Sequence, residues 1–297
     1  MVKIDLITGF LGSGKTTFIK KYAKYLMDSG ENICIIENDY GAINVDVMLV
    51  NELGCDIEMV SGGADHDCHI RRFKTKLIAA AMQGHTRVIV EPSGIFDPDE
   101  FYDILCEDPL SNWYEIGNVF CVYDFNTKDL SKESEYVLVS EAATCSKLIV
   151  SKRINNEILN LDYINSLMKK YKCMRVFNQN DIRYTDDLNF DELINSGFKQ
   201  YSHVKLQIIN DNEYDSFYLL DKDIDVNKIN EVKTILFNNN EYGHILRLKG
   251  FIKDNDKWIR INITKNEEEI SPILNGENVL IIIGENLNTK KIELLFN

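Results

Sequence analysis

The feature that most constrains this chain is the glycine-rich stretch at residues 9–17, which reads GFLGSGKTT. It fits the pattern G-x-x-x-x-G-K-[ST], follows an apolar run at residues 3–8 and opens a helical pattern at residues 15–28. Glycines let the backbone curl so that successive N–H groups point at phosphate oxygens, and the start of the following helix adds a favourable dipole. This strand–loop–helix context predicts a phosphate-binding loop for a nucleoside triphosphate rather than an incidental glycine turn.

Within this loop the predicted nucleotide contacts come from six consecutive residues, Gly12, Ser13, Gly14, Lys15, Thr16 and Thr17. Lys15 is expected to reach the β- and γ-phosphates, and the Thr16 hydroxyl is expected to bind Mg²⁺. Residues 8–24 contain four lysines and no acid, in a chain whose net charge is −14. The loop is therefore locally basic, as a triphosphate site requires.

Two apolar runs end in a carboxylate. Residues 87–91 end in Glu91, which we expect to support Mg²⁺ directly or through a water; the alternative is an ordinary acid capping the next helix. Residues 33–37 end in Glu37, with Asp39 and Asp46 soon after. Glu37 and Asp39 are predicted to orient water or Mg²⁺, the alternative being that they are solvated loop acids.

Strand-like and helical segments alternate through the first two-thirds of the chain. This alternation predicts a doubly wound, mostly parallel α/β sheet with its ligands at the carboxyl ends of the strands. Strands are expected at residues 3–8, 33–37, 57–60, 87–91, 118–123, 147–151 and 174–177, and helices at 15–28, 73–82 and 155–170. Residues 1–204 are expected to form this nucleotide-binding domain.

The pattern changes near residue 204, and residues 205–297 are expected to form a smaller α+β domain. Its expected strands lie at residues 205–209, 216–220, 243–253, 257–264 and 279–283, its expected helix at 226–239, and a short helix or strand end at 290–296. The two strands at 243–253 and 257–264 are predicted to form a hairpin around the turn at residues 254–256.

Composition excludes several classes of function. The chain has 33 Lys+Arg against 47 Asp+Glu, which argues against a general nucleic-acid binder. It contains no apolar run long enough for a membrane span and no signal-peptide core at its beginning, so we expect a cytoplasmic protein. The 7 cysteines are dispersed without a C-x-x-C pair, and Cys34, Cys121 and Cys173 are predicted to be core thiols.

Together these segments resemble the CobW-type P-loop GTPases, a group related to the UreG and HypB nickel chaperones. The resemblance rests on GFLGSGKTT, on ENDYG at residues 37–41, on VIVEPSG at residues 88–94 and on RLKGF at residues 247–251. It implies a GTP-hydrolysing switch protein that delivers a metal to, or activates, a metal- or corrinoid-dependent client enzyme. It also implies that residues 205–297 are the family's C-terminal domain and that the protein dimerises over its nucleotide.

The chain departs from this family at its metal-binding motif. Where the family has G-C-x-C-C, residues 61–69 read SGGADHDCH, with one cysteine. Asp65, His66, Cys68 and His69 are candidates for a mixed N/O/S site for Zn²⁺, Co²⁺ or Ni²⁺. The alternative is that the following helix begins here and presents its histidine and arginines, His69, Arg71 and Arg72, to an anion or a partner protein.

A second departure concerns the base. Where the family has N-K-x-D, this chain has Ser151, Lys152, Arg153 and Ile154. Lys152 is expected to stack its stem on the base, and Asn155 or Asn156 is a candidate substitute for the missing aspartate. The resemblance favours GTP, and the residues leave ATP open.

Three hypotheses about function remain. The first is a nucleotide-hydrolysing switch in which Lys15 and Thr16-bound Mg²⁺ hold the γ-phosphate while Glu91 or Glu37 positions the attacking water. The second is a small-molecule kinase with an arginine-bearing lid, for which Arg71, Arg72 and Arg87 are the nearby arginines. The third is a non-catalytic module that senses nucleotide.

Overall fold

The structure is a computed structural model that describes residues 1–10, 12–38, 54–60, 66–92, 98–128, 130–202, 215–265, 267–273, 276 and 278–296. The chain divides into two compact units, Met1–Gln207 and Ile208–Asn297. The expected domain boundary at residue 204 lies outside the described residues, and so does the expected strand at residues 205–209. No described helix is long and apolar enough to cross a membrane.

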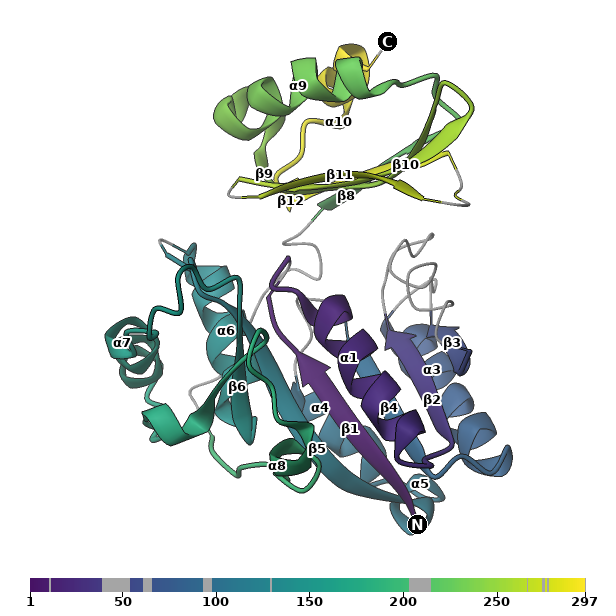
Figure 1. Ribbon diagram of the computed structural model, residues 1–297, viewed down its shortest axis with the longest axis vertical. Helices are drawn as coiled ribbons and strands as arrows, with labels where there is room; N and C mark the ends of the chain where they lie inside the picture. The colour runs from purple at the N-terminus through teal and green to yellow at the C-terminus, as the bar shows by residue number, and fades with distance from the viewer. Residues whose placement is uncertain are drawn as a thin grey trace. The chain divides into compact units, whose positions relative to one another are not determined.

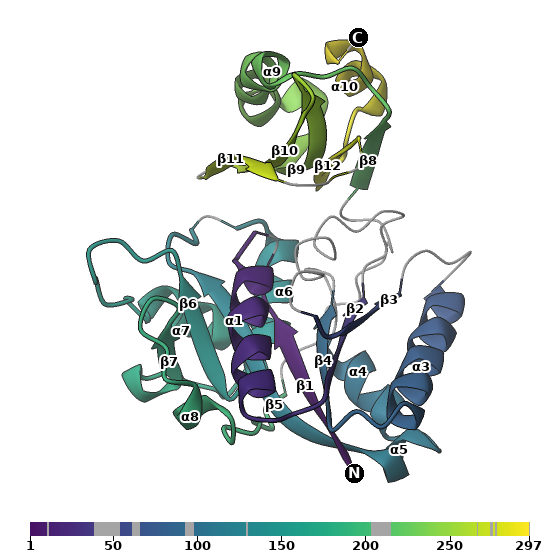
Figure 2. The same ribbon diagram turned by 45° about the vertical axis from the view of Figure 1, so that its right-hand side comes forward.

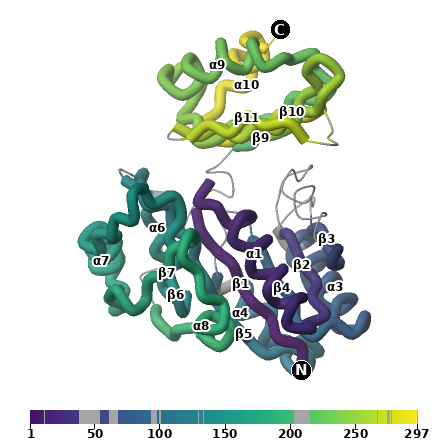
Figure 3. The backbone as a smooth tube through the Cα atoms, in the orientation of Figure 1, coloured from purple at the N-terminus to yellow at the C-terminus, as the bar shows by residue number. Residues whose placement is uncertain are grey.

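Among the described residues, the first unit contains a seven-stranded sheet in which every neighbouring pair of strands is parallel (Figure 1). Its strands are β1 (Val2–Thr8), β2 (Ile33–Asn38), β3 (Asp56–Val60), β4 (Arg87–Pro92), β5 (Tyr114–Asp124), β6 (Lys147–Ser151) and β7 (Ile182–Tyr184). Their order is β3-β2-β4-β1-β5-β6-β7, so β1 lies between two strands that are distant in sequence (Figure 3). This confirms the predicted doubly wound α/β sheet.

Helices cover both faces of this sheet, as Figure 2 shows for α1 and α3. On one face, α1 (Lys15–Asp28) and α8 (Phe190–Leu193) pack on the strands through Phe18, Tyr22 and Leu193. The other face is covered by α3 (His66–Met82), α4 (Pro98–Leu105), α5 (Leu110–Trp113), α6 (Lys132–Ala143) and α7 (Asp162–Lys170). Burial on both faces explains the nearly continuous apolar sequence of the strands.

Cys34, Cys121 and Cys173 lie in this core, as predicted, with exposed fractions of 5% or less.

Three expectations about the first unit are wrong. The helix expected at residues 73–82 already begins at His66. Residues 174–177 do not form a strand; Arg175 instead donates hydrogen bonds to the carbonyl oxygens of Ala142 and Ala143. The edge strand is β7, which follows a short 3₁₀ helix, η2 (Gln179–Asp181). The helix expected from residue 155 begins at Asp162, because Asn155 and Asn156 have φ values of 51° and 57°, which an α-helix does not accept.

The second unit has an antiparallel five-stranded sheet among its described residues, with the order β11-β10-β9-β12-β8. Its strands are β8 (Asp215–Leu220), β9 (His244–Asp254), β10 (Lys257–Thr264), β11 (Glu268–Ile273) and β12 (Val279–Glu285). One face is covered by α9 (Val226–Asn238) and α10 (Thr289–Leu295), and η3 (Asn240–Tyr242) precedes β9. The predicted α+β character and the β9–β10 hairpin are confirmed, whereas β11 was missed.

The RLKGF segment lies on β9, where its glycine has a clear structural reason. Gly250 has a φ of 154°, and a Cβ atom there would lie 2.1 Å from the carbonyl oxygen of Val279 on β12. The two strands therefore approach too closely at this point for any other residue.

Candidate nucleotide-binding site

The glycine-rich loop leaves β1 at Thr8, and three of its described residues have positive φ before α1 begins. Gly9, Gly12 and Gly14 have φ values of 141°, 75° and 95°. At Gly9 a Cβ atom would also lie 2.3 Å from the carbonyl oxygen of Val122 on β5. The loop thus lies directly against the neighbouring strand, and glycine at its first position is required by space as well as by backbone conformation.

We expect Gly9→Ala to lower the free energy of unfolding of the first unit by about 2–4 kcal/mol, because strain at positive φ adds to the clash with β5. The matched control is Gly30→Ala, where φ is 88° and a Cβ atom would meet nothing within 4 Å. That variant should lose only about 1–2 kcal/mol. Amide hydrogen exchange in β1 and β5 measures both losses, and equal losses would contradict the close approach.

The start of α1 has the properties of an anion site. Its N-cap is Gly14, no side chain caps its first N–H groups, and its first turn contains no acid. The Lys15 ammonium is buried beside it and donates a 2.7 Å hydrogen bond to the carbonyl oxygen of Gly9. Thr16 is half-buried and Thr17 exposed in the same turn. Uncapped N–H groups, a helix dipole and an ammonium group together fit a polyphosphate.

Glu37 and Glu91 are direct neighbours at the carboxyl edge of the sheet. They occupy paired register positions on β2 and β4, and their exposed fractions are 2% and 8%. Ile35 and Ile89, two residues earlier on the same strands, pack in one cluster with Phe18 of α1. Because side chains alternate along a strand, both carboxylates lie on the face that α1 covers. Two buried neighbouring acids on the face covered by α1, the helix that contains Thr16 in its first turn, fit a Mg²⁺ ion, whose charge would relieve their mutual repulsion.

The end of β6 and the residue that follows it contact the glycine-rich loop. The Ser151 hydroxyl donates a 2.6 Å hydrogen bond to the carbonyl oxygen of Ser13. The Lys152 ammonium donates to the carbonyl oxygen of Gly12 at 2.6 Å and pairs with Asp124 at 2.9 Å. Asp124 was not predicted to be a site residue, although it ends the apolar strand β5 much as Glu37 and Glu91 lie near the ends of theirs.

The candidate base contacts Asn155 and Asn156 are exposed, and so is Ile154, which stands where the family has aspartate. Ile154 has an exposed fraction of 55%, and Asn155 and Asn156 are exposed with left-handed backbone. Arg153 instead stacks on the Tyr184 ring at 4.0 Å. The contacts of Lys152 and of Asn155 or Asn156 with the base stay predictions.

Several residues of the predicted switch and metal segments lie outside the described residues. These are Asp39, Asp46 and Asp65, and the side chain of His66. Cys68 and His69 lie in the first turn of α3, where His69 is buried and Cys68 half-buried. Among the described residues there is no group of three or more His, Cys, Asp or Glu side chains that fits a metal ion.

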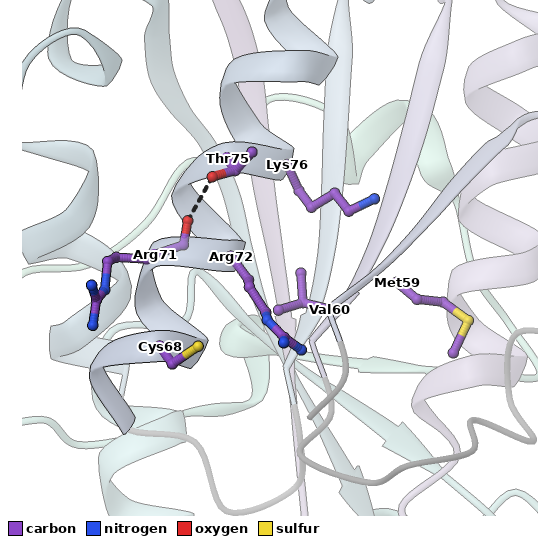
Figure 4. A pocket seen from close by; sticks show the side chains of 7 residues that line it. All are labelled: Met59, Val60, Cys68, Arg71, Arg72, Thr75 and Lys76. Atoms are coloured by element: carbon purple, nitrogen blue, oxygen red, sulfur yellow. Dashed lines mark hydrogen bonds between the residues drawn. The ribbon is translucent and has the colours of Figure 1, made fainter. Parts of the chain in front are cut away.

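Cys68 lines a cavity of about 500 Å³ between β3 and α3. The other lining residues are Met59, Val60, Arg71, Arg72, Thr75 and Lys76. Figure 4 shows Cys68, Arg72 and Lys76 on one side of the helix, as their i, i+4 spacing requires, and Arg71 extending away from them. Lys76 forms a 2.6 Å ion pair with Glu58. The described part of this segment therefore combines a thiol with cationic side chains.

Arg87 has a structural role and is not a lid arginine. It begins β4, at the opposite end of the strand from Glu91, and is 1% exposed. Its guanidinium donates a 2.7 Å hydrogen bond to Asp5, which also accepts from the Tyr22 hydroxyl at 2.7 Å and the Asn118 N–H at 2.6 Å. Burial, and then the Asp5 carboxylate, raise the pKa of Tyr22 well above its ordinary value. The kinase hypothesis thereby loses one of its three arginines.

A parallel sheet with a phosphate loop between its first strand and first helix defines a P-loop nucleotide-binding protein. A family model described as "CobW/HypB/UreG, nucleotide-binding domain" matches residues 3–173, which is more than half of the chain. The chain belongs to the CobW/HypB/UreG family. The resemblance seen in the sequence is thereby confirmed.

Two curated relatives come from Escherichia coli K12. The zinc chaperone YeiR is 29% identical over 125 residues, covering 42% of this chain and 38% of the relative. The zinc chaperone YjiA is 22% identical over 163 residues, covering 51% and 49%. The chain thus matches half or less of either relative's length. A solved structure of Zn(II)-bound YjiA GTPase is 16% identical and covers 99% of this chain and 98% of that one, with a TM-score of 0.38.

Proposed function

We propose that the chain is a GTP-hydrolysing metallochaperone or activator that serves a metal-dependent client enzyme. The observation that carries this proposal is the conjunction of an uncapped α1 N-terminus holding Lys15 with the register-paired Glu37 and Glu91 on the face that α1 covers. Membership of the CobW/HypB/UreG family supports it, and both curated relatives are zinc chaperones.

In the proposed reaction, Lys15 exchanges its bond to the Gly9 carbonyl oxygen for bonds to the β- and γ-phosphates. The Thr16 hydroxyl and Glu91, directly or through a water, hold Mg²⁺, which neutralises charge on the phosphate oxygens when bound. Glu37, beside Glu91, orients the attacking water. Ser151 and Lys152, at the end of β6, hold the glycine-rich loop from the side of β6, and the stem of Lys152 stacks on the base.

Three further properties are proposed from membership of the family. The second unit is its C-terminal domain, the protein dimerises in a nucleotide-dependent way, and it works in the reducing cytoplasm. The Lys152 ammonium is held beside the glycine-rich loop by Gly12 and Asp124, which supports a family-like base site and hence GTP. No described contact favours the kinase or the non-catalytic alternative.

The test of this function is a hydrolysis panel of GTP and ATP with Mg²⁺, alone and with Zn²⁺, Co²⁺ or Ni²⁺. We expect slow, Mg²⁺-dependent release of phosphate from GTP, faster than from ATP, and a change in rate with the cargo metal. Binding of nucleotide without turnover in any metal would support the sensing module instead. Transfer of phosphate to a small molecule, with negligible hydrolysis, would support the kinase.

We expect Cys68→Ala to weaken stoichiometric binding of Zn²⁺ at least about tenfold, because thiolate is the softest and strongest ligand in the proposed set with Asp65, His66 and His69. The matched control is Cys106→Ala, which removes an exposed thiol from α4's carboxyl end in the same unit. Competition titrations with a chromophoric chelator measure both affinities. Equal affinity in wild type and Cys68→Ala would show that this thiol is not a ligand.

A further inference from the structure

A buried acid lies beneath the glycine-rich loop. Glu141, on α6, is 0% exposed. Its backbone carbonyl oxygen accepts a 3.4 Å hydrogen bond from the hydroxyl of Thr8, the last residue of β1 before Gly9. Within the described part of the chain, neither oxygen of its carboxyl group has a hydrogen-bond partner of normal geometry. A fully buried carboxyl group in this condition is costly to ionise.

The charges around Glu141 come from the nucleotide site. Burial raises the pKa of Glu141 to about 8, against the effects of the Lys15 ammonium on α1 and the Gly9 N–H, which both lower it. On β5, burial first and then Cys145 and Glu141 raise the pKa of the Cys121 thiol well above its ordinary value, so this neighbour is neutral. Thr8, on β1, is neutral as well.

The remaining charged neighbours are engaged elsewhere. Arg175 donates to the carbonyl oxygens of Ala142 and Ala143 at the end of α6. Glu135, which lies earlier on the same helix, pairs with Lys170 of α7. Within the described part of the chain, Lys15 is thus the charged side chain that acts on the Glu141 carboxyl group.

In the free protein, Lys15 interacts with two groups from which the nucleotide phosphates would attract it. It is bonded to the Gly9 carbonyl oxygen at 2.7 Å and it stabilises the ionised form of Glu141. When phosphates attract the ammonium group and add negative charge, an ionised Glu141 loses its stabilising cation in a site that excludes water. Protonation of the carboxylate removes that penalty.

We infer that Glu141 is a positioning residue for Lys15 that is protonated in the nucleotide-bound state, so that its ionised fraction takes up one proton from solvent when a nucleoside triphosphate binds. This inference rests on the proposed nucleotide binding. The nucleotide-bound protein holds the proton, so nucleotide affinity is highest at pH values where Glu141 of the free protein is already protonated. Affinity declines as the pH rises through the range in which Glu141 of the free protein ionises. The decline is expected above about pH 8.

The test is calorimetric titration of the full chain with Mg²⁺ and a non-hydrolysable GTP analogue, in buffers that differ in ionisation enthalpy. At about pH 8 the wild type should take up about half a proton per nucleotide, and between about pH 8 and 9 its Kd should weaken by up to about tenfold. Glu141→Gln should abolish the proton uptake that comes from Glu141 and make the Kd independent of pH over this range. Glu135→Gln, the same change on the same helix, should behave as wild type. Protons taken up by the nucleotide analogue or by the cysteine thiols contribute equally in all three proteins, so they do not affect the comparison.

The outcomes separate this inference from the proposed function. Binding with no proton uptake at about pH 8–9, or with the same uptake in Glu141→Gln, overturns the inference alone. Failure of the wild type to bind nucleotide overturns both. If Glu141→Gln does not fold by circular dichroism, infrared difference spectra of the wild type decide. A protonated-carboxyl band that grows on binding at about pH 9 supports the inference, and its absence overturns it.

Discussion

Lys15→Ala is expected to weaken nucleotide affinity at least about a hundredfold while the protein remains folded. The ammonium group contributes charge-assisted hydrogen bonds to the β- and γ-phosphates, each worth about 1.5–3 kcal/mol, and a hundredfold loss corresponds to about 2.7 kcal/mol. In the nucleotide-free protein the same group bonds to the Gly9 carbonyl oxygen, so the affinity reports an exchange between two acceptors. Calorimetric titration with GTP and Mg²⁺ measures the change.

The control for this variant is Lys24→Ala, which removes the same charge from an exposed position on the same helix. It should change affinity less than about threefold, because an exposed charge more than two turns away is screened by salt. Circular dichroism checks that both variants fold. Unchanged affinity in Lys15→Ala would overturn the assignment of the phosphate-binding loop.

Arg87→Met is expected to lower the free energy of unfolding of the first unit by about 3–5 kcal/mol. Asp5 and Arg87 are 0% and 1% exposed, and removing the guanidinium leaves the Asp5 carboxylate buried without its cation. Methionine keeps most of the apolar stem, so lost packing contributes little to the change. Amide hydrogen exchange in β1 and β4, which are paired, measures the free energy of opening.

Arg183→Met is the comparison for this prediction. Arg183 forms a 3.2 Å ion pair with Glu192, whose side chain is 56% exposed, so its loss should cost less than about 1 kcal/mol. Folded Arg87→Met should bind nucleotide as wild type does, since Arg87 begins β4 and the site lies at the other end of that strand. A loss below about 1 kcal/mol would show that Asp5 does not depend on this cation.

Features that depend on neighbours in sequence were predictable. The strand at residues 3–8, the glycine loop and α1 follow from apolar periodicity and from glycine's access to positive φ. The start of α7 was misjudged because Asn155 and Asn156 adopt left-handed backbone in a segment whose periodicity looks helical. β11 was missed because its sequence, EEISPI, has two acids and a proline instead of a regular alternation.

Features that depend on tertiary packing were not predictable. Glu141 lies in the sequence KESEYVLVSEAA, and nothing in this sequence distinguishes it from a solvent-exposed acid. It is buried because α6 packs beneath the glycine-rich loop. Arg87 was counted among the arginines near the nucleotide site, but it lies at the opposite end of β4 from Glu91. Strand sequence does not reveal that Asp5 is the partner on β1, since residue pairing between parallel strands is decided by the sheet.

Among the described residues of the second unit, β11 is an edge strand of the five-stranded sheet, and this has consequences for how the protein behaves at high concentration. An open edge presents unpaired N–H and C=O groups to which another chain can add a strand. β11 begins with Glu268 and Glu269 and contains Pro272, which has no N–H to donate. Glu268 and Glu269 are paired with Lys233 and Arg260, so the missing donor at Pro272 is what opposes strand addition along this edge. The proline that helped to conceal β11 in the sequence thus also hinders polymerisation through it.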